Sequence, residues 1–353
     1  MTSNDRRGGY MGKILRVNLT RGTFMEERVH SETLRLFIGG VGLGIEMLYR
    51  EVPPFVQPHD PENRLFFLTG PLTGTSVPGS GMFEVISKSP LTGFVCSGQS
   101  NGYFGARLKW SGFDGIVFEG RSPEWVYLHI QNDVPEIRDA SFLLGKTVWE
   151  TEEHLKRLHG GKGSPMSVTS IGPSGERGVR FSAIMSDFGH VAATGGVGSV
   201  MGSKNLKAVV VQGNLKVPVD DSSRGLVRRL TREWTKKAMN EGPGTVFSKW
   251  GTQGLFASYH KLGWVPVKNL TTCLFPEAEQ FSVQYLREQA FKKVKRTPCH
   301  GCTFNHCRTI EIADGPYKGL VLEDPEYEDL AGWGPNVGIT DPRTAAMLTH
   351  VND

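Results

Sequence analysis

Long apolar runs are missing from this sequence of 353 residues, and none approaches the roughly 18–20 residues that a membrane-spanning helix needs. Charge of one sign is not in excess either. The chain has 40 Lys and Arg against 36 Asp and Glu, and a net charge of +4 gives no reason to expect a nucleic-acid partner. The opening residues MTSNDRRGGY contain no apolar segment after their charges, so we expect no secretory signal. These absences favour a cytoplasmic protein that contacts neither membrane nor nucleic acid.

Cysteine is scarce, with five in the chain. Cys96 and Cys273 stand alone and are interpreted as packing residues, whereas Cys299, Cys302 and Cys307 fall within nine residues. In a cytoplasmic protein, one tight group of cysteines indicates a metal site rather than disulfide bonds.

Two kinds of metal fit the segment Cys299-His-Gly-Cys302-Thr-Phe-Asn-His-Cys307. Iron–sulfur clusters usually take four cysteine thiolates, and three are close together here. Zinc competes because His300 and His306 offer imidazole nitrogens beside the sulfurs. The spacing favours iron–sulfur but leaves zinc open.

Glycine is abundant, at 44 residues, and its clusters lie in apolar loops. Residues 70–81 follow an expected strand, and their backbone amides are suited to surround an anion. Residues 195–202 are expected to begin a helix whose N-terminus suits a phosphate. Residues 39–44 resemble a dinucleotide fingerprint only superficially, because they lie within a helical pattern after no clear strand. Helix–helix packing explains this third cluster better.

Hydrophobic periodicity divides the chain near residue 214. Before it we expect a β-hairpin over 11–29 and a helix starting at Ser31 as N-cap. Further helices are expected over 102–110 and 148–158. The other expected strands are 64–70, 81–87, 112–120, 125–133, 166–175, 179–185 and 206–213. After the division, residues 220–240, 244–263 and 281–295 have helical spacing. The sequence therefore predicts an α+β protein, with a mixed domain over 1–213 and a mainly helical domain, cut short, over 214–353.

Several unusual strings, in this order, resemble the aldehyde:ferredoxin oxidoreductase family. GPLTGTSVPGSG (70–81), SKSPLTGF (87–94) and GYFGARLKWSGFDGIVFEG (102–120) resemble its first domain. SIGPSGE (170–176) and GGVGSVMGSKNLKAVVV (195–211) continue the resemblance. The cysteine segment and GLVLEDPEYEDLAGWGPNVGITD (319–341) extend it into the second domain. It covers essentially the whole chain.

The resemblance implies a function and a set of site residues. Such enzymes hold tungsten or molybdenum between two pterin dithiolenes, oxidise small aldehydes to carboxylic acids, and pass electrons through a [4Fe–4S] cluster to ferredoxin. Cys299, Cys302 and Cys307 would then be cluster ligands. Glu328 would be the catalytic acid or base near the metal, or alternatively a plain helix-start carboxylate, the kind of structural role that we favour for Glu326. The pterin-facing residues implied are Gly81, Met82, Gln99, Ser100, Asn101, Gly102, His190, Val191, Ala192 and Gly195, with Gln99 and Asn101 placed in a polar loop.

The chain departs from the family pattern in four ways. The spacing from Cys302 to Cys307 is one residue longer. Met82 stands where the family has an arginine, and Val191 and Thr194 stand where arginines are expected, which should weaken cofactor binding. The chain ends before the second set of pterin loops and the fourth cluster cysteine. A metal site between subunits is expected to be lost, because Met347 precedes His350 where the family has an acidic residue.

Two explanations of these departures are possible. The chain is part of a split or truncated enzyme that needs a second polypeptide or a missing C-terminal region, or it is a degenerate copy. We favour the first because the cysteines and Glu328 persist. Alternative functions are a tungsten subunit of an acyl-CoA reductase complex and a catalytically silent zinc or scaffold protein. A basic group before the cysteines would attract an acidic ferredoxin, or is merely a solvated helix end. It consists of Lys292, Lys293, Lys295 and Arg296.

Overall fold

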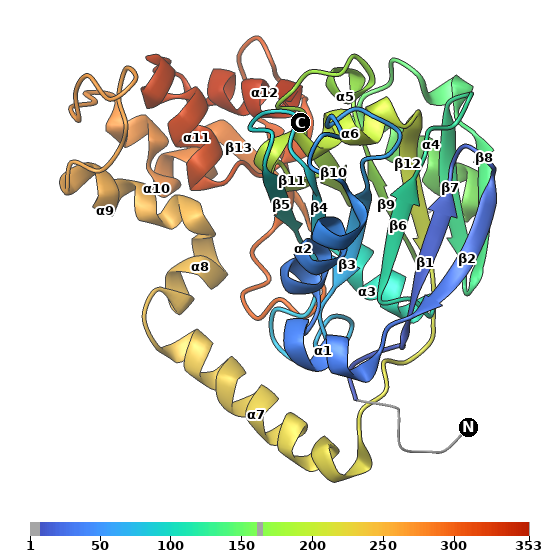
Figure 1. Cartoon of the computed structure of the whole chain (residues 1–353). Helices are drawn as coiled ribbons and strands as arrows, with labels where there is room; N and C mark the ends of the chain where they lie inside the picture. Colours follow the sequence, from blue (N-terminus) through green and yellow to red (C-terminus); the bar gives the residue numbers. More distant parts are fainter. Residues whose placement is uncertain (1–7, 161–164, 353) are drawn as a thin grey trace. The chain divides into compact units, whose positions relative to one another are not determined.

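The chain divides into two units, Met1–Arg229 and Leu230–Asp353, in a computed structural model that describes residues 8–160 and 165–352 (Figure 1). Mixed sheets and helices make up the first unit, and helices predominate in the second, which confirms the α+β class. Helix α7 (Asp221–Asn240) runs across the division, so the domain boundary expected near residue 214 stays a prediction. In the described ranges, no helix combines the length and apolarity needed to cross a membrane.

The first sheet contains the expected N-terminal hairpin, and its strand order is β2-β1-β6-β3-β4-β5. Strand β6 lies between β1, to which it is parallel, and β3, to which it is antiparallel. The expected strands at 64–70, 81–87 and 112–120 are confirmed, whereas β5 was not foreseen. The strands are β1 (Lys13–Asn18), β2 (Thr23–Arg28), β3 (Leu65–Thr69), β4 (Phe83–Lys88), β5 (Val95–Ser100) and β6 (Gly115–Glu119).

Two helices, α1 (Ser31–Phe37) and α2 (Gly40–Glu51), cover one face of this sheet (Figure 1). The single helix expected from Ser31 is wrong, because Ile38 takes a φ of 64° and breaks it. Ser31 is not the N-cap either, since His30 holds that position without a side-chain cap. Within the glycine run 39–44, Gly42 packs against the end of α1 as expected. Gly44 instead faces the sheet, where a Cβ would lie 2.8 Å from Cδ1 of Ile86.

The second sheet has the order β11-β10-β9-β12-β7-β8. Strand β12 is inserted between β7, to which it is parallel, and β9, to which it is antiparallel. The expected strands at 125–133 and 206–213 are confirmed in shortened form, and that at 166–175 is confirmed up to Ser170. The strand expected at 179–185 is wrong except for its last two residues, and β8 and β11 were not foreseen. The strands are β7 (Val126–Gln131), β8 (Val134–Asp139), β9 (Met166–Ser170), β10 (Ile184–Ser186), β11 (His190–Ala192) and β12 (Leu206–Gln212).

One hydrophobic core joins the two sheets of the first unit. It contains Phe67 and Val85 from the first sheet, Leu128 and Val209 from the second, and Phe104 from helix α3 (Phe104–Trp110). Helix α4 (Val148–His159), expected as an amphipathic helix, packs Leu155 against the far face of the second sheet. The remaining short helices of this unit are η1 (Ser141–Leu143), α5 (Pro173–Glu176), η2 (Thr194–Gly196) and α6 (Val197–Ser203).

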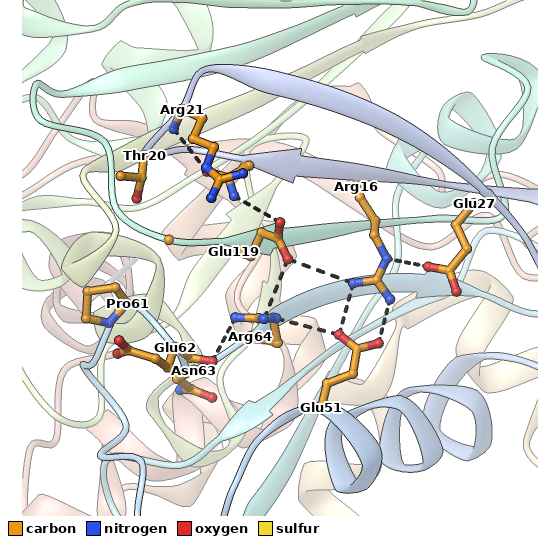
Figure 2. A network of polar contacts seen from close by, with 12 residues as sticks. Arg16, Thr20, Arg21, Glu27, Glu51, Pro61, Glu62, Asn63, Arg64 and Glu119 are labelled. Atoms are coloured by element: carbon orange, nitrogen blue, oxygen red, sulfur yellow. Dashed lines mark hydrogen bonds and ion pairs between the residues drawn. The ribbon is translucent and has the colours of Figure 1, made fainter.

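Ion pairs link strands β1, β2 and β6 of the first sheet with the end of α2 and with Arg64 (Figure 2). Arg16 of β1 pairs with Glu27 of β2 and with Glu51 at the end of α2, the latter at 2.5 Å. Arg64, just before β3, lies 3.6 Å from both Glu51 and Glu119. Because a one-residue slip would reverse every side chain of a strand, this network favours one register for the N-terminal hairpin.

The second unit combines short helices with a three-stranded antiparallel sheet in the order β13-β14-β15. Its strands are β13 (Phe291–Arg296), β14 (Arg308–Ile312) and β15 (Val321–Glu323). Its helices after α7 are α8 (Gly244–Trp250), η3 (Thr252–Leu255), α9 (Phe256–Lys261), η4 (Ala278–Phe281), α10 (Val283–Tyr285), η5 (Leu286–Ala290), α11 (Tyr327–Trp333), η6 (Pro335–Val337) and α12 (Pro342–Asn352).

The helix expected over 281–295 is only partly present, because the chain becomes strand β13 at Phe291. Pairing with β14 overrides the helical pattern, since a strand gains its stability from a partner distant in sequence. The basic group therefore lies on an exposed edge strand, and the interpretation as a helix end is wrong. Lysines on an edge strand also discourage pairing with another chain.

Candidate functional site

The pterin-facing residues expected in the first unit come from distant segments that meet at the end of β5. The hydroxyl of Ser100 donates to the carbonyl of His190 at 2.9 Å. Gly98 packs on Ala192, and Gly195 packs on Cys96. Gly105 of α3 lies against the carbonyls of the two residues that precede β4, which are Gly81 and Met82. The structure thus brings the expected residues into one region, while their role stays a prediction.

Several of these residues present side chains to solvent. Gln99, Asn101 and Val191 are exposed, and Met82 and His190 are half-buried. Gln99 lies on strand β5 rather than in the expected loop, where its amide donates to Glu84 at 2.8 Å. Glu84 also accepts a hydrogen bond from Ser97, so two side chains of β5 are tied to β4.

Asp187, which the sequence analysis did not single out, holds this region together. Its carboxylate accepts hydrogen bonds from the backbone amide of Tyr103 at 2.6 Å and from the hydroxyl of Ser167 at 2.7 Å. Asp187 and Phe188 both have positive φ, in the tight turn between β10 and β11. The polar sequence of that turn signals its presence but not the contact with residues 102–103.

Some backbone amides of the two expected anion sites donate hydrogen bonds within the protein. In the loop 70–81, the amides of Thr73 and Gly74 donate to carbonyls of the same loop, and the amide of Gly70 donates to the hydroxyl of Thr73. At the start of α6, the amide of Gly198 donates to the carbonyl of Ser182. These four amides are thus used within the protein, while the expectation that the amides of these segments surround an anion stays a prediction.

Gly102 has a φ of 83°, and an added Cβ would lie 2.5 Å from Oδ2 of Asp187 and 2.7 Å from Cδ2 of His190. We expect Gly102→Ala to lower the free energy of unfolding by about 2–4 kcal/mol, from left-handed backbone and steric overlap together. Gly79→Ala is the matched control, since Gly79 has a φ of 76° with nothing within 4 Å. Denaturant unfolding measures both, and equal losses would contradict the steric part.

The three clustered cysteines of the second unit lie in the segment between β13 and β14, where two of their sulfurs come close together. The Cys302 amide donates to the Cys299 carbonyl at 3.2 Å, and the Thr297 amide donates to the Cys307 carbonyl at 2.9 Å, which closes the base of the loop. The sulfurs of Cys299 and Cys307 lie within 4.8 Å of each other. The amide of Asn305 points at Sγ of Cys302, at 3.3 Å.

Electrostatics favour the thiolate at one of these sulfurs. Burial alone would raise the pKa of Cys302, but hydrogen bonds from His306 and the Asn305 amide lower it overall. The hydrogen bond with Cys299, together with burial, raises the pKa of Cys307. The pKa of His306 rises to about 10 through its hydrogen bonds with Cys302 and Glu326. Since thiolate is the form that binds metals, these contacts favour metal binding at Cys302.

Two carboxylates at the start of α11 differ in their surroundings. Glu326 is the N-cap residue, shares a capping box with Asp329, and lies 3.3 Å from Nε2 of His306. Glu328, the second residue of the helix, is exposed. The cap geometry accords with the structural role favoured for Glu326, and the catalytic role of Glu328 stays a prediction.

A buried group of ion pairs adjoins the cysteine segment, and it was not predicted from the sequence. Asp324 accepts hydrogen bonds from Arg287 at 2.9 Å and from Gln253 at 3.1 Å, and it pairs with Arg308 at 3.3 Å. Its amide also donates to the Arg308 carbonyl, at 2.8 Å. Arg308 follows Cys307 directly, so this group fixes the backbone that carries the third thiol.

Comparison with known proteins shows which family the chain belongs to. The family model for the aldehyde ferredoxin oxidoreductase N-terminal domain matches residues 14–213, and the model for domains 2 and 3 of the same family matches residues 229–353. The chain belongs to the aldehyde ferredoxin oxidoreductase family. The resemblance noted in the sequence is thereby confirmed.

Relatives in this family are longer than the chain. The tungsten-containing aldehyde ferredoxin oxidoreductases of Pyrococcus abyssi and Thermococcus kodakarensis are 42% and 39% identical to it over 346 residues, which are 98% of this chain. The match covers 55% and 56% of those proteins. An aliphatic sulfonate oxidoreductase, WOR-like subunit, of Pyrococcus furiosus is 36% identical over 98% of this chain and 56% of its own length. The chain thus spans about half the length of these curated relatives.

A solved structure has the same fold. The active-site complex BamBC of benzoyl coenzyme A reductase, in complex with 1,5-dienoyl-CoA, superposes with a TM-score of 0.83 at 28% identity. The superposition covers 98% of this chain and 53% of that chain.

The other two cysteines of this family member differ from each other. Cys96 is buried in the core of the first unit, as expected, and burial raises the pKa of its thiol to about 11. Cys273 is exposed, so its interpretation as a packing residue is wrong.

Proposed function

We propose that this chain is the cofactor-binding part of an oxidoreductase that oxidises aldehydes to carboxylic acids and passes the electrons to ferredoxin. It would hold a tungsten or molybdenum bis-pterin and a [4Fe–4S] cluster, in the reducing cytoplasm, where thiols stay free. The relatives named tungsten-containing aldehyde ferredoxin oxidoreductase support this assignment. The observation that carries it is the segment 299–307, where the sulfurs of Cys299 and Cys307 lie within 4.8 Å of each other and hydrogen bonds lower the pKa of Cys302.

The donor set of this segment fits a cluster. Cysteine thiolates are the usual ligands of iron–sulfur clusters, whose chemistry is to take up and release single electrons. The pKa of Cys302 is lowered, and the Asn305 amide and His306 supply hydrogen bonds of the kind that surround bound sulfurs. Asp324 and its arginines keep the loop in place.

The region at the end of β5 would hold a pterin through backbone and polar groups. Gly98, Gly102 and Gly195 allow other backbone segments to approach closely there, and Gln99 and Asn101 present amides to solvent. Met82 and Val191 make no charged contact with a phosphate, so the binding energy must come from amides and from further parts of the enzyme. The exposed carboxylate of Glu328 would accept a proton as water or hydroxide adds to the aldehyde.

We assign the remaining walls of the site to a further C-terminal region or a second polypeptide. Apolar side chains beside the pterin region are exposed, with Leu91 at 55%, Phe94 at 77% and Phe181 at 72%. Contiguous exposed apolar surface marks an interaction site. The protein that accepts the electrons would be an acidic ferredoxin, whose charge is complementary to the basic group exposed on β13. This group consists of Lys292, Lys293, Lys295 and Arg296.

A second candidate is a subunit of an acyl-CoA reductase complex. The superposition on BamBC of benzoyl coenzyme A reductase favours it, with a TM-score of 0.83. The two candidates share cofactors and differ in substrate.

Metal analysis of oxygen-free protein, with any polypeptide that copurifies, tests this function. We expect about four iron atoms per chain, tungsten or molybdenum, and reduction of ferredoxin by small aldehydes. Turnover of an aromatic acyl-CoA without aldehyde oxidation would favour the second candidate. Zinc with neither iron nor pterin would show a silent scaffold and refute both.

A further inference from the structure

His306 lies between a cysteine sulfur and a carboxylate. Its Nε2 atom is 3.7 Å from Sγ of Cys307 and 3.3 Å from Oε1 of Glu326, and one ligand atom of each of the three residues lies within 4.8 Å of the others. The imidazole is 21% exposed, so solvent screens it only in part. His306 belongs to the stretch between Cys302 and Cys307 that has one residue more than the family pattern.

The carboxylate beside His306 is held rigidly. The hydroxyl of Thr252 donates to Oε2 of Glu326, and the Glu326 amide donates to Oδ2 of Asp329 at 3.0 Å. The Tyr327 amide in turn donates to the Thr252 hydroxyl at 2.8 Å. Glu326 can therefore orient the ring of His306, because its own position is fixed by the helix cap.

We propose that the hydrogen on Nε2 of His306 is shared between Glu326 and the sulfur of Cys307, and that this hydrogen bond sets the reduction potential of the cluster that the cysteines hold. This inference rests on the proposed function, since it requires the iron–sulfur cluster. Hydrogen bonds to the sulfurs and nearby charge are among the factors that set cluster potentials. A hydrogen-bond donor withdraws electron density from a thiolate and so stabilises the reduced cluster. The negative charge of Glu326 destabilises the reduced cluster. His306 is thus a positioning residue rather than a ligand.

A redox titration followed by electron paramagnetic resonance tests the proposal on the full chain, purified without oxygen together with any companion polypeptide. At the potential where the wild-type cluster is half reduced, we expect His306→Leu to lower the ratio of reduced to oxidised cluster about tenfold, which is about 59 mV for one electron. His306→Gln keeps an amide donor near Nε2 and should recover most of the shift. Glu326→Gln should raise the ratio. His260→Leu, in α9, is the control and should leave it unchanged.

The outcomes are distinguishable. Potentials unchanged in His306→Leu, with wild-type iron content, overturn this inference and leave the proposed function intact. Loss of iron from both His306→Leu and His306→Gln would identify His306 as a ligand. That result also overturns this inference. Zinc in place of iron in the wild-type chain overturns the inference and the proposed function together. Shifts of opposite sign in His306→Leu and Glu326→Gln, at full iron content, support it.

Discussion

Cys302→Ser is expected to remove most of the iron from the chain. The structure gives this sulfur the hydrogen bonds that favour the thiolate, and a serine hydroxyl supplies no comparable anion. Iron affinity should fall by more than the roughly 10–100-fold that loss of a hydrogen-bonding neighbour of a metal ligand costs. Iron content per chain and the visible absorption of the cluster, both recorded without oxygen, measure the effect.

Cys273→Ser is the matched control for this prediction. Cys273 belongs to the same unit, is exposed, and lies outside the segment 299–307. Its replacement should leave the iron content unchanged. Full iron retention in Cys302→Ser would remove this residue from the ligand set, whereas equal loss in both variants would point to a general effect of thiol removal.

Asp114→Ala is expected to lower the free energy of unfolding by about 3–5 kcal/mol, because it leaves the buried charge of Lys109 without a counter-ion. The two side chains are 3% and 0% exposed, and Nζ of Lys109 lies 2.5 Å from Oδ1 of Asp114. Asp114 also accepts hydrogen bonds from the amides of Met11 and Gly12 at 3.0 and 2.6 Å, and Lys109 donates to the Gly9 carbonyl at 2.5 Å. The pair therefore fixes the backbone of residues 9–12, which leads into β1.

Denaturant unfolding of the single and double variants checks this result. The double variant Lys109→Met, Asp114→Ala should lose less stability than the two single changes added together, since neither charge is then left alone. The control is Arg138→Ala, because Arg138 pairs with Glu136 at the surface with 41% and 51% exposure. That change should cost less than about 1 kcal/mol. A loss of similar size in Asp114→Ala would contradict the role given to burial.

Local sequence patterns predicted the parts of the fold that depend on neighbouring residues. The hairpin over 11–29 and the buried strand at 64–70 follow from alternation and turn residues. Strand β13 could not be predicted in the same way, because the basic residues at 292–296 lack an apolar face and take their conformation from β14. The break at Ile38 was equally hidden, since it is Gly44 packing on the sheet that sets the direction of α2.

The candidate site, like the fold, could be predicted only where it depends on local sequence. The cysteine spacing indicated a metal centre, and the order of the motifs indicated the family. The contacts that shape the site join residues far apart in sequence, such as Asp187 with Tyr103 and Arg287 with Asp324. Spacing carries no signal for such pairs. The contact of His306 with Glu326 was missed for this reason, because Glu326 belongs to the cap of a helix distant in sequence.

The order of strands in the first unit has a consequence for synthesis on the ribosome. Strand β6 enters between β1 and β3, and β12 enters between β7 and β9, although in each case both neighbours are made earlier. A nascent chain that stops before residue 212 therefore carries strands with unpaired edges, which are sites of aggregation. A division of this unit into two polypeptides before β12 would therefore leave the edges of β7 and β9 open until the second polypeptide supplied the missing strand.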